Sequence, residues 1–585
     1  MRSNELHRLV RRGDIGRLHE FLHSRSREKG DVNTFDAAGS TPLMYAVQGP
    51  RANPELVRTL LDAGANVHQY SKRSFQAGYS VLALALNGGD PSIVAMLLEA
   101  GADLGYQREG GYDALLDAVH GRDLTRDERL LDLLRLLVAK AATLDGITQY
   151  SESGLLVLSS VGRFDAVRVL LDSGANGGRL RWTPLFHAVA FGSLDDVERL
   201  IGEGAPLEEK DWWGRTPWLL AIHAGDLPKA QLLHRHGANT KACGACAKPP
   251  MTFAVESHHP HVLRWLIDLG LDVEQGDEFE STALMAAAES SDLECLEILL
   301  GASAIVDRVQ NGETALSRAR SRLVAMRLLD AGADPRYLRH EGQRVLLGFE
   351  PEPDADLLEV SQEDFRRART RRFGEANPEQ MNEPFWLAMI RAGLTGYDAA
   401  SSFGGRSSMT DPPVWCAQRF GQSITFLPDG RIVQIAGEHE DSYDPDFCIY
   451  NDVFVHEPGG AVHIYGYPES VFPPTDFHTA TLVGDFIYII GSLGYHGARR
   501  FGETQILRLD TRTWRIEQLT ASGQQPGWLY EHRAILTAPD EITVSGGKIA
   551  NLVEDREVHQ ENAGRFVLDL RRLLWRECFR AGAGV

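Results

Sequence analysis

The first 345 residues carry a recurring pattern of apolar and small residues that predicts pairs of short helices. The string Leu-Leu-Asp-Ala-Gly-Ala-Asn at residues 60–66 ends an apolar stretch, and related strings follow at 97–103, 170–176, 232–239 and 328–334. Glycine, which lacks a Cβ, suits the left-handed position that ends a helix. From Gly174 onward these glycines lie 30 to 33 residues apart. Each unit therefore predicts two helices joined by short loops.

A second string precedes several of these units and predicts the start of a helix. It reads Gly-Ser-Thr-Pro-Leu at residues 39–43, Trp-Thr-Pro-Leu at 182–185 and Gly-Arg-Thr-Pro-Trp at 214–218. Thr is a favoured N-cap, and Pro is favoured at the first helical position. The two strings together resemble the ankyrin repeat family over residues 1–345, in about nine units with a degenerate first unit at Leu6–Phe21. The resemblance implies a curved solenoid that binds proteins and performs no chemistry.

From residue 411 the pattern changes to the alternation typical of strands. Three apolar strands end in small residues, at 431–437, 486–492 and 541–547, and a turn precedes each of them. Two of the three units continue to a second strand that ends in Trp. The pattern resembles blades of a kelch-repeat β-propeller. A closed propeller needs about four blades or more, so three blades predict an open wedge, a propeller shared between two chains, or a further set of strands in the connector. Open sheet edges would favour self-association.

Residues 346–410 separate these two regions. The sequence Glu-Pro-Glu-Pro-Asp at 350–354 predicts a stiff acidic linker, and two short helices are expected after it. The predicted fold class is α+β with three parts. These are an ankyrin solenoid at 1–345, a linker and helical connector at 346–410, and about three kelch-like blades at 411–585.

Composition restricts where the chain works. Its 585 residues carry a net charge of -21 and only six cysteines. So acidic a surface repels phosphate backbones, and few cysteines indicate a reducing compartment. No apolar run reaches about 20 residues, the length that spans a bilayer, and the N-terminus lacks the apolar segment of a signal peptide. We expect a cytoplasmic protein that binds neither nucleic acid nor membrane, and the excess of Arg over Lys favours a bacterial source.

The candidate partner-binding site lies in one turn between repeats. Trp212 and Trp213 follow Asp211 where the ankyrin family has small polar residues, and exposed aromatic side chains are common anchors of interfaces. The alternative is that one indole packs on the neighbouring turn. An acidic stretch further along the chain predicts either a solvated face or the steering of a basic protein partner. Its members are Asp272, Glu274, Asp277, Glu278 and Glu280.

The loops of the kelch-like blades predict a second candidate site, a rim of carboxylates and imidazoles. Such groups bind a metal or a polar ligand when they converge, and otherwise bond to neighbouring backbone. The predicted members are Glu438, His439, Asp476, His478, Tyr495, His496, Glu531 and His532.

Candidate metal and catalytic motifs are few. The pair Cys243 and Cys246 has metal-ligand spacing, but a helix separates it from His258, His259 and His261. No zinc-binding His pair, phosphate loop or nucleophile elbow occurs in the chain. We therefore predict no catalytic residue, no metal and no cofactor. The favoured interpretation is a non-enzymatic scaffold that binds a protein through the ankyrin face. The alternative is a propeller that binds a metal or small ligand, with or without catalysis, and is targeted by the ankyrin array.

Overall fold

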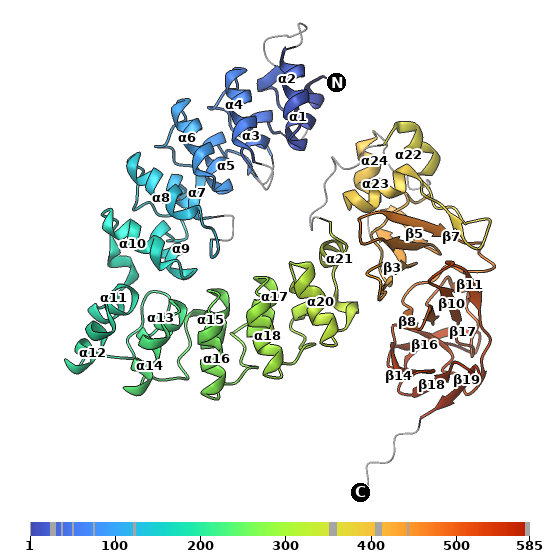
Figure 1. Cartoon of the computed structure of the whole chain (residues 1–585). Helices are drawn as coiled ribbons and strands as arrows, with labels where there is room; N and C mark the ends of the chain where they lie inside the picture. Colours follow the sequence, from blue (N-terminus) through green and yellow to red (C-terminus); the bar gives the residue numbers. More distant parts are fainter. Residues whose placement is uncertain are drawn as a thin grey trace. The chain divides into compact units, whose positions relative to one another are not determined.

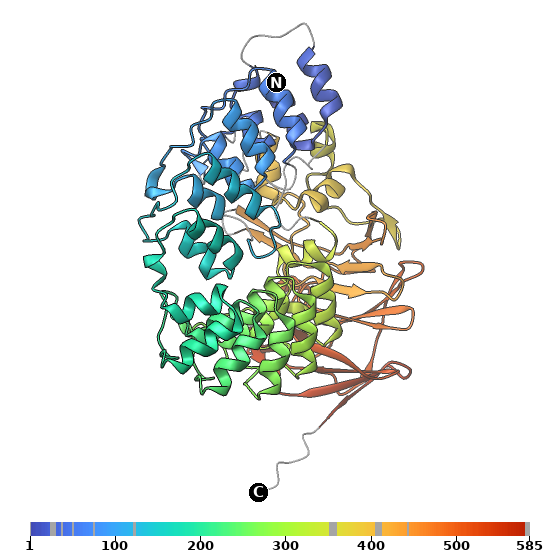
Figure 2. The ribbon, with the colours of Figure 1, turned by 60° about the vertical axis from the view of Figure 1, so that its left-hand side comes forward.

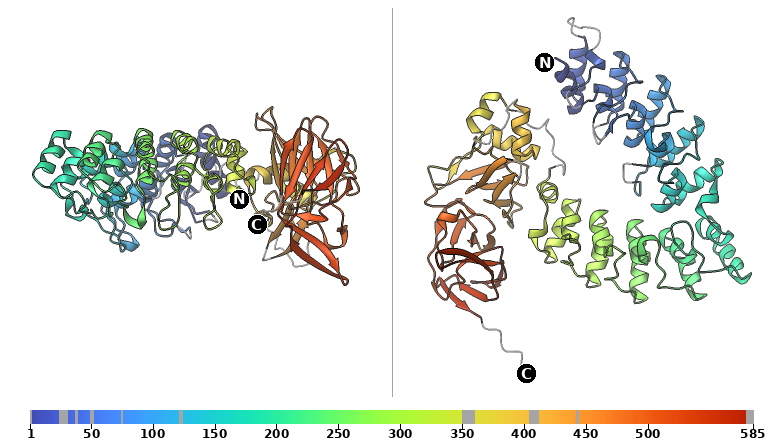
Figure 3. Two further views of the ribbon diagram at one scale, coloured as in Figure 1. Left: turned by 90° about the horizontal axis from the view of Figure 1, so that it is seen from below. Right: turned by 180° about the vertical axis from the view of Figure 1, so that it is seen from behind.

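The computed structural model describes residues 2–23, 31–36, 39–48, 52–73, 76–120, 124–349, 360–403, 412–441 and 444–578. The acidic linker predicted at 350–354 lies outside the described residues. The chain divides into two compact units (Figure 1). The first is Met1–Ala319 with Asp330–Ala333, and the second is Arg320–Leu329 with Asp334–Val585. Figure 2 and Figure 3 show helices and loops in the first unit and the strands in the second.

The first unit is a stack of antiparallel helix pairs. In chain order the pairs are α1 (Arg2–Arg12) with α2 (Ile15–His23), α3 (Pro42–Ala46) with α4 (Pro54–Asp62), α5 (Val81–Gly88) with α6 (Pro91–Glu99), α7 (Ala114–Val119) with α8 (Leu130–Ala139), α9 (Gly154–Ser160) with α10 (Phe164–Asp172), α11 (Pro184–Phe191) with α12 (Leu194–Gly202), α13 (Pro217–His223) with α14 (Leu227–Arg235), α15 (Pro250–Glu256) with α16 (Pro260–Asp268), and α17 (Ala283–Glu289) with α18 (Leu293–Gly301). A tenth pair, α19 (Ala315–Arg318) and α20 (Arg322–Asp330), straddles the division between the units. The described residues thus hold ten pairs, where the sequence predicted about nine.

The Thr-Pro strings begin helices and the glycines of the Leu-Leu strings follow helix ends, as their local chemistry predicts. The Thr216 side chain accepts a hydrogen bond from the Leu219 N–H, and Pro217 takes the first helical position. Gly64 and Gly237 adopt φ values of 87° and 89° after their helices. Because these signals are local, they fix the helix ends independently of the partner helices.

The stacking is interrupted once, at a junction between α9/α10 and α11/α12 that we call the corner. Inner helices normally pack on the next inner helix, as α11 does on α13, but α9 packs on the short turn η4 (Gly177–Leu180) instead. Figure 1 shows α11 and α12 displaced outward, with α9 next to α13. Side chains confirm this contact, because Ser159 accepts from Arg215 at 2.7 Å and the Phe164 ring meets the His223 ring edge-on at 5.6 Å.

A second contact crosses the corner through residues 124–127, which we call the clasp. Arg163 fixes the clasp by donating to two of its carbonyl groups, at 2.6 and 3.0 Å. From the clasp, an Arg126 nitrogen lies 2.6 Å from Nδ1 of His258. The same Nδ1 lies 2.8 Å from the carboxylate of Asp292, which caps α18. The clasp therefore links segments about 130 residues apart in sequence.

The second unit is built around three antiparallel meanders. The first sheet has the order β1-β7-β6-β3-β2, the second β11-β10-β9-β8 and the third β12-β19-β18-β15-β14. Two insertions form a three-stranded sheet, β13-β16-β17, and a hairpin, β4-β5. The strands are β1 (Glu379–Gln380), β2 (Ser423–Phe426), β3 (Ile432–Ile435), β4 (Glu438–Asp441), β5 (Asp444–Ile449), β6 (Val453–His456), β7 (Val462–Gly466), β8 (Thr479–Val483), β9 (Phe486–Ile490), β10 (Ile506–Asp510), β11 (Ile516–Gln518), β12 (Ser522–Gly523), β13 (Trp528–Tyr530), β14 (Arg533–Ala538), β15 (Glu541–Ser545), β16 (Lys548–Val553), β17 (Arg556–Glu561), β18 (Arg565–Asp569) and β19 (Leu574–Glu577).

The three sheets pack face to face in chain order. Val433 and Ile435 of the first sheet share a core with Ile487 and Ile489 of the second. The opposite face of the second sheet packs on the third through a core that contains Trp575. The strands β2, β8 and β14 lie side by side where the sheets meet. Among the described residues the sheets do not close into a ring.

Helices of the connector cover the free face of the first sheet. They are α22 (Gln362–Ala368), α23 (Pro384–Ala392) and α24 (Gly396–Ser402). Before the connector, α21 (His340–Leu346) contacts α23, because Arg344 donates to the Ile390 carbonyl at 3.2 Å. Trp386 of α23 stacks on Trp415 at 5.0 Å, and both belong to a core that includes Phe454 of the sheet. Strand β1 also covers the outer edge of this sheet by pairing with β7. The connector therefore occupies a face and an edge that the sequence led us to expect open.

Candidate partner-binding site

The turns between helix pairs project as fingers, and an aspartate closes several of them. Oδ1 of Asp211 accepts hydrogen bonds from the N–H groups of Trp213 and Arg215, both at 2.9 Å. Asp277 closes its own finger in the same way. Because local side-chain bonds of this kind compete well with solvent in turns, these carboxylates hold the finger's shape. Asp211 is also only 2% exposed, so it lies outside any surface that a partner could reach, contrary to the sequence prediction.

A buried cation joins the finger of Asp211 to the corner. Arg215 is 0% exposed, and its guanidinium donates to Asp211 at 2.7 and 2.9 Å and to both oxygens of Ser159 at 2.7 Å. It also donates to Nδ1 of His223 at 2.8 Å. Burial, followed by the charge of Arg215, holds the pKa of His223 well below its usual value, so the ring is neutral.

This network also determines what His223 can do chemically. Arg215 can only donate, so Nδ1 of His223 is the acceptor and the ring proton sits on Nε2. The Ser257 hydroxyl lies on that side of the ring, because both groups approach Gly162. A protonated Nε2 cannot take a proton from a serine, so this pair cannot act as nucleophile and general base.

Neighbouring fingers are joined through their backbones. The Trp213 carbonyl accepts from the Ala245 N–H, and the Cys246 carbonyl accepts from the Glu278 N–H, each at 2.9 Å. These bonds place the tips of three consecutive fingers in direct contact. The tips therefore form one continuous frame.

The two tryptophans of the predicted site occupy different surroundings. Both are half-buried, and their rings lie 4.9 Å apart. Trp212 packs against the core that ends at Leu180, and its backbone N–H donates to the Leu180 carbonyl at 3.2 Å. Trp213 lies at the tip, beside the finger of Ala245. Neither indole N–H has a hydrogen-bond partner in the part of the chain that the structure describes.

The predicted acidic stretch divides into structural and exposed members. Glu274 accepts from the Ile305 N–H at 2.8 Å and pairs with Arg308 at 3.2 Å, so its charge is used within the fold. Asp277 closes its finger, as described above. The exposed members are Asp272, Glu278 and Glu280. Only these three offer charge to a partner.

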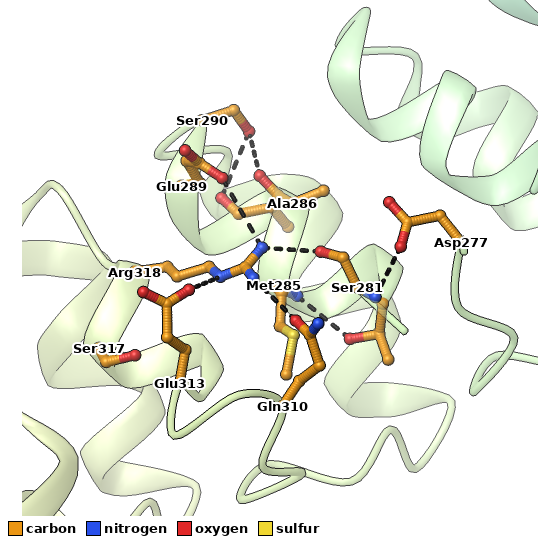
Figure 4. A network of polar contacts seen from close by, with 12 residues as sticks. Asp277, Ser281, Met285, Ala286, Glu289, Ser290, Gln310, Glu313, Ser317 and Arg318 are labelled. Carbon is orange, nitrogen blue, oxygen red and sulfur yellow. Dashed lines mark hydrogen bonds and ion pairs between the residues drawn. The ribbon is translucent and has the colours of Figure 1, made fainter. Parts of the chain in front are cut away.

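Arg318 joins the next finger to the frame, as Figure 4 shows. Its guanidinium donates to Ser281 Oγ at 2.7 Å, to Gln310 Oε1 at 3.0 Å and to Glu313 Oε2 at 2.9 Å. These bonds hold the finger of Gln310 against the finger that contains Phe279. The fixed frame thus extends over four fingers.

Sequence reasoning missed two exposed apolar side chains at the tips of this frame. Phe279 is 58% exposed and Val309 is 47% exposed. Together with the half-buried Trp213 and the exposed Cys246 they occupy the tips of four consecutive fingers, and we call these four residues the finger strip. A signal was present, because Phe279 stands between Glu278 and Glu280, where an apolar residue has no core to join.

The predicted rim histidines join neighbouring sheets. Nε2 of His478 lies 2.8 Å from Oγ of Ser423, and Nε2 of His532 lies 2.9 Å from Oγ1 of Thr479. Each bond links the first strand of one sheet to the residue before the first strand of the next. Burial lowers the pKa of His478 to about 3, so it is neutral near pH 7.

The remaining predicted rim residues do not converge on one point. Asp476 is fully buried and accepts from the Gly494 N–H at 2.6 Å, while burial raises its pKa. Tyr495 accepts from the Ile449 N–H, and it lines a cavity of about 460 Å³ that no other predicted rim residue lines. Glu438 and His439 are both buried. His496 is exposed and pairs with Glu557, while Glu531 pairs with Lys548. Within the described ranges, no three His, Cys, Asp or Glu residues are grouped to hold a metal ion.

Comparison with known proteins finds ankyrin repeats in the helical region. The family described as "Ankyrin repeats (3 copies)" matches residues 6–108, 185–277 and 252–337. The unmatched stretch from 109 to 184 contains α7 to α10 and ends at the corner. No kelch or propeller family is found, so that resemblance has no support from sequence comparison. No helix within the described parts of the chain is long and apolar enough to cross a membrane.

Three relatives illustrate the similarity. Ankyrin repeat protein nuc-2 of Neurospora crassa is 27% identical over 168 residues, which are 28% of this chain and 16% of the relative. Human ankyrin repeat domain-containing protein 63 is 31% identical over 23% of this chain and 37% of its own length. Mouse cyclin-dependent kinase 4 inhibitor B is 31% identical over 20% of this chain and 92% of its own length.

The relatives are eukaryotic, so the bacterial source expected from composition has no support among them. The chain spans 16% and 37% of the first two relatives, and the similarity lies in the repeats that they share. The third relative is covered almost completely at 31% identity. Through its helical region, this chain belongs to the ankyrin-repeat family.

Proposed function

We propose that this chain is a non-enzymatic adaptor that binds a protein partner through the ankyrin array. The observation that carries the proposal is the finger strip, four apolar or half-buried side chains on a hydrogen-bonded frame. Exposed apolar residues on a rigid frame lose little entropy on binding, and they gain free energy when a partner covers them. Membership of a family whose repeats bind proteins supports the same role. The exposed Asp272, Glu278 and Glu280 favour a basic partner.

Within this proposal Trp213 contacts the partner, and Trp212 packs between Trp213 and the core. A half-buried aromatic at an interface contributes about 2 kcal/mol when truncated. We expect Trp213→Ala to weaken partner binding by that amount without a change in circular dichroism. Trp212→Ala should lower the stability of the corner as well, because this ring belongs to the core.

The test is affinity capture with the full chain and with Trp213→Ala, followed by binding measurements on the captured protein. Tyr70→Ala is the matched control, because Tyr70 is 58% exposed and precedes the corner. A captured protein that binds the parent and Tyr70→Ala but loses affinity for Trp213→Ala supports the proposal. Equal binding to all three would place the site elsewhere.

We also propose that the three meanders are blades of a partial propeller and offer a second interaction surface. Three successive sheets, each built on a four-stranded antiparallel meander, with β2, β8 and β14 side by side, support this interpretation. We further propose that the adaptor acts in the cytoplasm. All six cysteines are free thiols, which suits a reducing compartment.

A further inference from the structure

The finger strip defines the shape of its partner as well as its position. We propose that it binds an amphipathic helix whose apolar stripe is flanked by Lys and Arg. This inference rests on the adaptor function proposed above, and it assigns a class of ligand to the same surface.

The spacing of the finger strip fits a helix. Packed helix pairs are stacked about 10 Å apart, so their finger tips repeat at about that distance. Seven residues of an α-helix rise about 10.5 Å and return to the same face. Side chains at positions i, i+7 and i+14 of a partner helix therefore meet successive fingers, and residues at i+3 and i+4 fill the gaps between them.

The backbone of the fingers argues against the other common mode, addition of a strand. Such a mode needs unpaired N–H and C=O groups along an edge. Here the Trp213 and Cys246 carbonyls already accept from Ala245 and Glu278 of the next finger. With these groups used between fingers, recognition has to come from side chains, as it does when a helix lies in a groove.

Charge on the two sides of the strip selects the flanks of the helix. Phe279 is 58% exposed and stands directly between Glu278 and Glu280, both of which are exposed. Among the residues that the structure describes, neither acid has an ion pair with a basic side chain, whereas Glu274 is paired with Arg308. Because Glu278 and Glu280 are the chain neighbours of Phe279, a helix that covers Phe279 lies close to both carboxylates, and Lys or Arg beside its apolar stripe would neutralise them.

The test uses fluorescein-labelled model helices of about 18 residues, or five turns. The first places Leu in one stripe with Lys on both flanks. The second has the same stripe with Glu on the flanks, and the third has the Leu and Lys of the first redistributed around the helix. Fluorescence anisotropy measures the affinity of each peptide for the full chain. Parent, Phe279→Asp, Val309→Asp and Tyr150→Asp are compared.

Tyr150→Asp is the matched control, because Tyr150 is 69% exposed on a finger before the corner. We expect the Leu/Lys stripe to bind the parent and Tyr150→Asp equally, and Phe279→Asp and Val309→Asp at least about 10-fold more weakly. Adding an acidic side chain would attract a basic peptide by charge alone, so a loss of affinity reports the apolar contact. Binding should weaken further with the Glu-flanked peptide and with rising salt.

Two results would overturn the inference. One is equal binding of the striped peptide to the parent and to Phe279→Asp, and the other is equal binding of the striped and redistributed peptides. Either result, together with a captured protein that depends on Trp213, leaves the adaptor function intact and rejects only the helical ligand. If the captured protein binds Trp213→Ala as well as it binds the parent, the adaptor site itself is rejected.

Discussion

Replacement of Arg215 by Met tests whether a buried polar network holds the corner. The substitution keeps most of the side-chain volume and removes the charge. It leaves the Asp211 carboxylate buried without its cation, and it removes the donors to Ser159 and to His223. Asp211→Asn removes the opposite charge while keeping an oxygen that accepts from the finger backbone.

The expected cost follows from burial and from the number of bonds. Both side chains of the Arg215–Asp211 pair are 0% exposed. Breaking a buried pair by removing one partner typically costs about 3–5 kcal/mol, because the other charge remains without compensation. We expect about 4 kcal/mol for Arg215→Met. The double variant with Asp211→Asn should recover about 2 kcal/mol of this, since it carries no unpaired charge.

Urea-induced unfolding followed by circular dichroism gives these free energies, and hydrogen exchange of α9 and α13 localises the effect. Arg264→Met is the control, because Arg264 pairs with Glu294 on the surface, where the side chains are 54% and 59% exposed. An exposed pair of this kind contributes at most about 1 kcal/mol. If Arg215→Met costs no more than this control, the network does not hold the corner.

Two further predictions concern histidines. Burial lowers the pKa of His456 to about 4 and that of His478 to about 3, from the ordinary histidine value of about 6.5. The unfolded chain therefore binds protons that the folded chain does not, and stability should fall as pH drops below 6.5, by about 2 kcal/mol per histidine at about pH 5. Urea unfolding of the full chain at several pH values measures this, and a flat profile between pH 7 and pH 5 would contradict it. For the clasp, Arg126 bonds to Nδ1 of His258 at 2.6 Å and also pairs with Asp292 at 3.6 Å. Arg126→Ala should therefore speed hydrogen exchange in residues 257–259 by about 10-fold or more, whereas Arg135→Ala, which removes an exposed pair with Asp132, should not.

Local chemistry made most of the fold predictable from the sequence. The Leu-Leu-x-x-Gly strings and the Thr-Pro strings set helix ends through bonds within a few residues, and the structure has helices at these places. The turns before β3, β9 and β15 predicted those strands for the same reason. The corner was not predictable in this way, because it depends on Arg215 and Ser159, which are 56 residues apart.

The candidate site was only partly predictable. The sequence singled out Trp213, whose role in binding stays a prediction, but it could not distinguish Asp211, which shapes the finger, from an acid that faces solvent. The sequence did offer one sign that Asp211 is paired, because Arg215 follows it four residues later. The rim histidines were predicted either to bind a ligand or to bond to neighbouring backbone, whereas His478 and His532 bond to side-chain hydroxyls 55 and 53 residues earlier. This recurrence indicates a structural role, because a ligand site has no reason to repeat with every sheet.

The corner has a mechanical consequence. Ordinary helix pairs are held together by many weak apolar contacts. We therefore expect a stack under tension to lengthen gradually and to shorten again when the tension is released. At the corner, the directional bonds of Arg215 join α9 to α13, and the clasp adds the bond from Arg126 to His258; such bonds weaken steeply with distance and angle. Tension applied to the two ends of the array would collect at this junction and release it in one abrupt step. The ankyrin region then acts as two stiff arms with a built-in yield point, whose strength depends on the guanidinium groups of Arg215 and Arg126.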